Sequence, residues 1–197
     1  MAANQSLSLF ISSKMQELIE ERRAVQTALS HYKMHGWLWE KDAGARPESI
    51  RQTYLKEVEA CDLYIGLFWL GYGPDTIKEF EHARLHHKPC LIYEKHVDIV
   101  RRDARLQAFL DRIGEVADGL AICRFMTVDE LAGRVQDDVL GLLTRQFRAG
   151  QKSSTARQQP HRKVVARDHS IAVGSDNYGT ITQHNIDGLQ PGDDGHD

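Results

Sequence analysis

Apolar residues in the first 149 positions follow two alternating patterns. Short continuous apolar runs, such as those at 7–11 and 63–69, are typical of strands buried on both faces. After each run, apolar residues recur every three or four positions, as they do along one face of a helix. The expected strands lie at 7–11, 37–40, 63–69, 90–93 and 120–125, and a helix is expected after each of them.

This alternation of strand and helix predicts an α/β fold, with a parallel sheet between two helical layers. Right-handed crossovers and a length near 149 residues favour a flavodoxin-like three-layer sandwich, with the five strands in the order 2-1-3-4-5. Ser13 and Gln16 fit a capping box at the start of the first helix, and the second helix is expected to begin at Pro47.

The composition changes after position 149. We expect residues 1–149 to form the folded domain and residues 150–167, which are basic and carry no acid, to form a flexible linker. Residues 168–197 are rich in Gly and Asp. Their alternating apolar positions suit short strands, but two short strands alone are not stable in water. This tail is therefore expected either to self-associate or bind a partner, or to be disordered.

The net charge of -3 lacks the basic excess that nucleic-acid binding usually requires. The three cysteines are far apart and lie in apolar runs, so we expect reduced thiols and neither a disulfide framework nor a metal site. With no apolar run long enough to span a membrane and no export signal, a cytoplasmic location is expected.

In such sheets, ligands bind at the carboxyl ends of the strands where the strand order changes direction, here between strands 1 and 3. This rule nominates Ser12 and Ser13 after the first strand, and residues 70–76 after the third. The second loop ends with Gly73, Asp75 and Thr76, where a helix N-terminus would favour an anionic group.

Glu79 has two readings. Thr76 and Glu79 fit a capping box, in which the glutamate only satisfies backbone N–H groups. Alternatively, Glu79 faces the crevice, where the helix dipole would lower its pKa and keep it ionised for cleavage of an N-glycosidic bond. Glu81 is the fallback candidate, although it projects about 200° away around the helix. His86 and His87 are adjacent, so their side chains diverge and we expect no metal between them.

Several strings resemble a TIR-like family of unknown function. They are FISS at 10–13, MQEL at 15–18, EERR at 20–23, EVEACDLYIG at 57–66, Tyr72-Gly73 and EFEHA at 79–83 before Lys88-Pro89. The resemblance covers about residues 7–95. Lys14 and Glu17 depart from it, since that family usually has Thr and Asp there. Members often stand at the N-termini of NACHT and related STAND NTPases.

More distantly, Asp75, Thr76 and Glu79 before Lys88-Pro89 are similar to the carboxylate helix of nucleoside deoxyribosyltransferases and catalytic TIR domains. That resemblance implies that Glu79 acts on NAD or a related nucleotide, with NAD as substrate and no cofactor. The residues expected to line the pocket are Phe10, Ser12, Ser13, Trp69 and Tyr72. Arg46 is expected to bind a phosphate group.

The resemblance also implies a defence or stress effector that is activated by assembly, and the tail is the candidate for bringing copies together. The alternative is an adaptor, in which the crevice senses a nucleotide or contacts a separately encoded NTPase or protease. The two readings differ in whether Glu79→Gln abolishes turnover.

Overall fold

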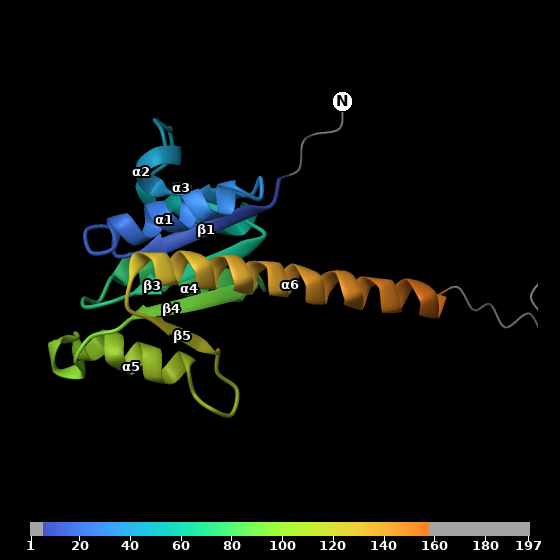
Figure 1. Cartoon of the computed structure of the whole chain (residues 1–197). Helices are drawn as coiled ribbons and strands as arrows, with labels where there is room; N and C mark the ends of the chain where they lie inside the picture. The colour runs from blue at the N-terminus through green and yellow to red at the C-terminus, as the bar shows by residue number, and fades with distance from the viewer. Residues whose placement is uncertain (1–5, 158–197) are drawn as a thin grey trace, which may run out of the picture. The chain divides into compact units, whose positions relative to one another are not determined.

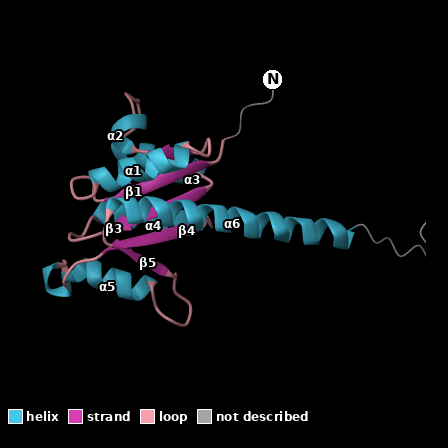
Figure 2. Ribbon diagram, in the orientation of Figure 1, coloured by secondary structure: helices cyan, strands magenta, loops and turns pink. Residues whose placement is uncertain are grey.

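The computed structural model describes residues 6–157 of the 197-residue chain. The strands are β1 (Ser8–Ser13), β2 (His35–Trp37), β3 (Leu63–Phe68), β4 (Cys90–Lys95) and β5 (Ile122–Phe125). The helices are α1 (Ile19–Ser30), α2 (Trp39–Asp42), α3 (Ile50–Ala60), α4 (Pro74–Leu85), α5 (Ala104–Ile113) and α6 (Val128–Arg157), with a short 3-10 helix at Ile99–Arg101. Figure 1 follows this order along the chain, and Figure 2 separates strands from helices.

The five strands form one parallel sheet in the order β2-β1-β3-β4-β5, which confirms the predicted topology. In the register of the sheet, Phe10 of β1 lies opposite Trp37 of β2 and Tyr64 of β3. Because all strands are parallel, their carboxyl ends meet at one edge, and the loops that lead into the helices gather there.

Helices cover both faces of the sheet. One core packs β1, β3 and β4 side chains such as Phe10 and Tyr64 against α3, α4 and α5. The other packs alternate residues, such as Leu9 and Ile11, against α1 and α6. In Figure 1, α1 and α6 lie in front of the sheet, while α3 and α4 lie behind it. The alternation of β1 thus aims Phe10 and Ser12 at the α3 and α4 layer.

Some expected boundaries were wrong. The second strand ends at Trp37, and the expected strand residues 39–40 form the short helix α2, where Asp42 Oδ2 accepts the Leu38 backbone N–H at 2.7 Å. Ser13 is the last residue of β1 and caps nothing, since α1 begins at Ile19 without a side-chain cap.

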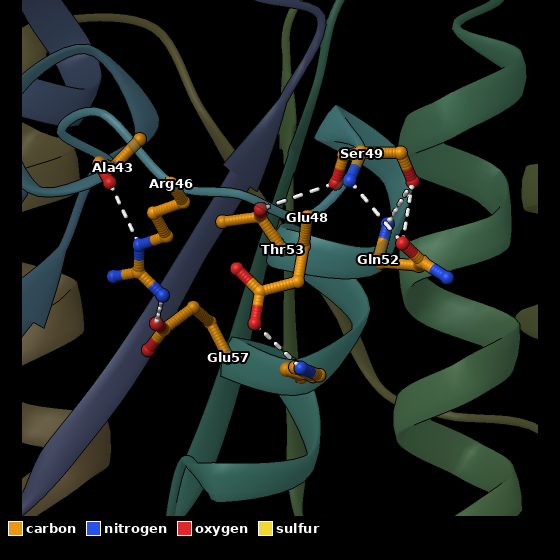
Figure 3. Close-up of polar contacts among 8 residues, drawn as sticks. Ala43, Arg46, Glu48, Ser49, Gln52, Thr53 and Glu57 are labelled. Atoms are coloured by element: carbon orange, nitrogen blue, oxygen red, sulfur yellow. Dashed lines mark hydrogen bonds and ion pairs between the residues drawn. The ribbon is translucent and has the colours of Figure 1, made fainter.

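The helix expected from Pro47 begins instead at Ile50. There, Ser49 and Gln52 form a capping box in which each side chain bonds the other residue's backbone N–H (Figure 3). At the other end of the chain, α6 continues to Arg157, so residues 150–157 of the expected linker are helical. The rest of that linker and the whole tail at 168–197 lie outside the described residues.

Candidate functional site

A cavity of about 500 Å³ opens at the carboxyl end of β1, in the size range of small-molecule sites. Its walls come from the end of β1 and the loop after it, from residues around α2, from the first turns of α3, and from the start of α4. The lining residues are Phe10, Ile11, Ser12, Ser13, Lys14, Met15, Gln16, Arg22, Trp37, Trp39, Glu40, Ile50, Tyr54, Tyr72, Gly73, Pro74, Asp75, Thr76 and Glu79.

Glu79 reaches this cavity from the second turn of α4. The helix begins at Pro74, where proline is well tolerated because the first N–H of a helix has no intrahelical partner. Thr76 is therefore the third helical residue, and the start of α4 has no side-chain cap, so the expected capping box was wrong. Instead, Glu79 Oε2 accepts a hydrogen bond from Ser12 Oγ across the end of β1.

Burial raises the pKa of the Glu79 carboxyl from 4.5 to about 7. The charge of Asp75 raises this pKa as well, whereas the Ser12 hydrogen bond and the charge of Arg22 lower it. The expectation of a lowered pKa was therefore wrong. A helix N-terminus contributes only about 0.3–1 kcal/mol at an exposed site, which is less than the cost of burying a carboxylate away from water.

On the other side of β1, a buried arginine organises the floor of the cavity. Arg22 of α1 is 3% exposed. Its guanidinium donates to Ser13 Oγ at 2.9 Å and to Glu40 Oε1 at 2.7 Å. These contacts join β1, α1 and α2. They also provide hydrogen-bond partners for the buried guanidinium and for the Ser13 hydroxyl group.

Aromatic rings form the apolar wall. Phe10 and Trp37 stack with ring centroids 4.9 Å apart, and Trp39 meets Trp37 edge to face at 6.2 Å. Tyr54 of α3 donates its hydroxyl to Asp75 Oδ1 at 3.1 Å, which links the two helices at the mouth of the cavity. Flat apolar surface beside a few polar groups suits a planar ring carried on a polar scaffold.

The two loops that frame the cavity are tied together by Glu17. Its Oε2 accepts the backbone N–H groups of Leu70 and Gly71 at 3.2 and 3.1 Å, while Oε1 pairs with Lys14 Nζ at 2.5 Å. A Cβ added at Gly71 would lie 2.1 Å from Lys14 Nζ, so any other residue there would force this side chain to move.

Most of the candidate residues converge on the cavity, namely Phe10, Ser12, Ser13, Tyr72, Gly73, Asp75, Thr76 and Glu79. Three others lie elsewhere. Arg46 bonds the Ala43 carbonyl oxygen at 2.8 Å and Glu57 at 2.5 Å (Figure 3). Lys95 lies over the ring of Trp69, 4.5 Å from its centroid. Glu81 lines a second cavity and pairs with Arg112 at 3.6 Å.

Sequence reasoning missed Arg22, Trp39 and Tyr54. For Arg22 a signal was available, since this residue occupies an otherwise apolar position of the α1 pattern, and a charge on a buried helical face needs partners. The other two come from α2 and α3, and nothing in the local pattern indicates that they face β1.

These features define an α/β protein of flavodoxin-like fold with a ligand-sized cavity at the carboxyl edge of its sheet. The family model described as "Domain of unknown function (DUF4062)" matches residues 8–140, and the chain belongs to that family. No curated protein matches it. None of the helices within residues 6–157 has the length and apolar character needed to cross a membrane.

Solved structures with low sequence identity are similar to this chain. The CMP N-glycosidase BcmB of Clostridium botulinum has 13% identity and a TM-score of 0.48, covering 65% of this chain and 96% of its own. The solution structure of BlsM has 15% identity and a TM-score of 0.42, with coverages of 67% and 91%. The TIR domains of the activated Roq1 resistosome have 13% identity and a TM-score of 0.43, with coverages of 67% and 82%.

Proposed function

We propose that this protein is a TIR-like N-glycosidase that hydrolyses the bond between base and ribose in NAD or a related nucleotide. Glu79 is its catalytic carboxyl group. The observation that carries the proposal is the position of Glu79 in the wall of a cavity of about 500 Å³, bonded to Ser12 and with its pKa raised to about 7. Strongly perturbed carboxyl groups in clefts are candidates for catalysis.

The chemistry follows from the charge that develops when the bond breaks. As the bond between the anomeric carbon and the base nitrogen lengthens, positive charge builds on the sugar, and an ionised carboxylate stabilises it or attacks the carbon. Water then supplies the hydroxyl group of the free sugar. The electron pair of the broken bond leaves with the base, and the water proton passes to the base or to solvent.

The raised pKa matters differently for two kinds of leaving group. A cationic nicotinamide leaves as a neutral ring, and its charge beside Glu79 would favour the ionised carboxylate. A neutral base needs a proton as it leaves, and a carboxyl group with a pKa of about 7 is well suited to deliver it. The pH dependence of base release therefore separates the two substrate classes.

Other parts of the cavity support a nucleotide. Trp39, which is partly exposed, offers a stacking surface for the base, and the buried rings of Phe10 and Trp37 support it from the core. Ser12 orients the carboxyl group through its hydrogen bond. Lys14, which lines the cavity with 43% of its side chain exposed, replaces Arg46 as the cation for a phosphate.

The test is base release from NAD, nucleoside 5′-monophosphates and deoxynucleosides by concentrated wild type, Glu79→Gln and Glu81→Gln. Glu81 is the matched control because it lies on the same helix but lines another cavity. We expect Glu79→Gln to lose at least about 100-fold in rate, since positioned acid–base groups contribute about 10²–10⁴-fold. Equal rates in all three proteins would remove Glu79 from the chemistry.

The second candidate function is an adaptor that binds a nucleotide without cleaving it. It is favoured by Lys14 and Glu17, which stand where the resembled family usually has Thr and Asp and which form a pair at the cavity mouth. Binding of NAD by wild type and Glu79→Gln with no release from either would support this reading.

We also propose that assembly activates the protein in prokaryotic defence or stress signalling, through residues 168–197 or through a separately encoded NTPase or protease. A truncation after Arg157 keeps every described element. If it leaves the oligomer size unchanged in sedimentation, the tail is not the assembling segment.

A further inference from the structure

Three side chains with metal-ligating atoms converge at the far end of α4, away from the cavity. They are His82 and His86 of α4 and Glu59 of α3. His82 Nε2 lies 2.8 Å from Glu59 Oε1, and His86 Nε2 lies 3.5 Å from the same oxygen. The two imidazole rings lie side by side, with centroids 4.5 Å apart.

We infer that Glu59, His82 and His86 form a binding site for a divalent transition-metal ion of the zinc class, which joins α3 to α4. All three ligand atoms lie within 4.8 Å of one another. In a tetrahedral zinc site, bonds of about 2.0–2.2 Å separate the ligand atoms by about 3.3–3.6 Å. The distance of 3.5 Å from His86 Nε2 to Glu59 Oε1 matches that spacing. The distance of 2.8 Å from His82 Nε2 is shorter, as in a hydrogen bond, and would lengthen slightly around an ion.

The chemistry of the three donors selects the ion. Two imidazole nitrogens and one carboxylate oxygen suit zinc and copper, whereas magnesium and calcium prefer sites made of oxygen alone. The spacing His-x-x-x-His places both rings on one face of a helix. Glu59 is 47% exposed and His86 is 39% exposed, so solvent can supply a fourth ligand.

A simple hydrogen-bonded cluster explains the geometry less well. One hydrogen bond from His82 to Glu59 accounts for the 2.8 Å contact, but at 3.5 Å the contact from His86 is at the outer limit for such a bond. If both rings were protonated instead, two like charges would lie with their ring centroids 4.5 Å apart. A shared cation lets both neutral imidazoles face the same carboxylate.

The site continues a stripe along α4 that faces α3. Asp75, Glu79, His82 and His86 are spaced by four, three and four residues, which keeps them on one side of the helix. Asp75 bonds Tyr54 at one end of the stripe, and Glu59 meets both histidines at the other. An ion held there would fix the distance between the two helices that form walls of the cavity.

The experiment is zinc binding to the full chain, measured by titration calorimetry and by thermal unfolding with zinc and with magnesium. The variants are His86→Ala and Glu59→Gln at exposed positions, and His82→Ala. His87→Asn is the control, because His87 adjoins the cluster but lies outside it, and asparagine tolerates its φ of 54°.

We expect wild type and His87→Asn to bind one more equivalent of zinc than the three cluster variants, or to bind it at least about 10-fold more tightly. Zinc should raise their unfolding temperature and magnesium should not. Equal zinc stoichiometry and affinity in wild type, His86→Ala and Glu59→Gln would overturn the site. No substrate is present in the measurement, so its outcome is independent of the proposed catalysis.

Discussion

Replacing Glu79 by glutamine should stabilise the fold in a pH-dependent way. The folded protein holds the Glu79 proton with a pKa of about 7, against 4.5 for an unperturbed glutamate. At pH values between these two pKa values, the folded state binds more protons than the unfolded state. The stability that this proton contributes is therefore complete below about pH 4.5 and is lost as the pH rises through about 7.

The magnitude follows from the same two numbers. A pKa difference of 1 corresponds to about 1.36 kcal/mol, so ionising Glu79 in the fold costs about 3 kcal/mol. Glutamine has no charge to bury, and its amide oxygen can still accept the Ser12 hydrogen bond. At about pH 8, Glu79→Gln should be more stable than wild type by about 3 kcal/mol, and at about pH 5 by less than about 1 kcal/mol.

The assay is urea unfolding of wild type, Glu79→Gln and Glu81→Gln at both pH values, followed by tryptophan fluorescence. At about pH 8 the midpoint of Glu79→Gln should rise by about 1 M urea or more. Glu81→Gln should stay within about 0.5 kcal/mol of wild type at both pH values, because its exposed pair with Arg112 contributes little. A gain of equal size at both pH values, or a loss at about pH 8, would refute the burial argument.

Two further variants test groups around the site, and a third tests a buried ion pair outside the cavity. Ser12→Ala removes the hydrogen bond that lowers the pKa of Glu79, so the pH profile of base release should move to higher pH. Asp75→Asn removes the charge that raises this pKa, so the same profile should move to lower pH. If the profiles of both variants moved in the same direction, Glu79 would not be the group that sets the pH dependence. Arg102→Ala removes the guanidinium that bonds the buried Glu94 at 2.5 Å. The free energy of unfolding, measured in urea, should fall by about 3 kcal/mol. A fall of less than about 1 kcal/mol would mean that solvent replaces the ion pair.

The fold could be predicted because its signal is local and repeated. Each strand is a continuous apolar run, and each helix has a three-to-four residue apolar period, so the order of elements follows from the sequence. The second strand was placed two residues too late because Trp39 is apolar and β2 is only three residues long. The capping boxes failed because Ser13 and Thr76 had the right residue types but stood inside their elements.

The position of Glu79 could be predicted, but its protonation could not. The topology puts the start of α4 beside the end of β1, and the sequence places Glu79 there. Its pKa depends on how completely the surrounding side chains exclude water, which is a property of tertiary packing. The same limit applies to Tyr54 and Trp39, whose contribution to the cavity depends on the paths of the loops before α2 and α3.

The histidine cluster was missed for a different reason. His86 and its neighbour His87 point in different directions, whereas residues four apart share a helix face, so His82 was the relevant partner of His86. Glu59 lies on another helix, and its approach to both rings follows only from the packing of α3 against α4.

Whether Glu79 is catalytic is decided by measuring binding and turnover of NAD together, with wild type and Glu79→Gln at high protein concentration. We predict that both proteins bind NAD with similar affinity and that only the wild type releases nicotinamide. Release at the same rate by the glutamine variant would show that the carboxyl group beside Ser12 does not break the N-glycosidic bond.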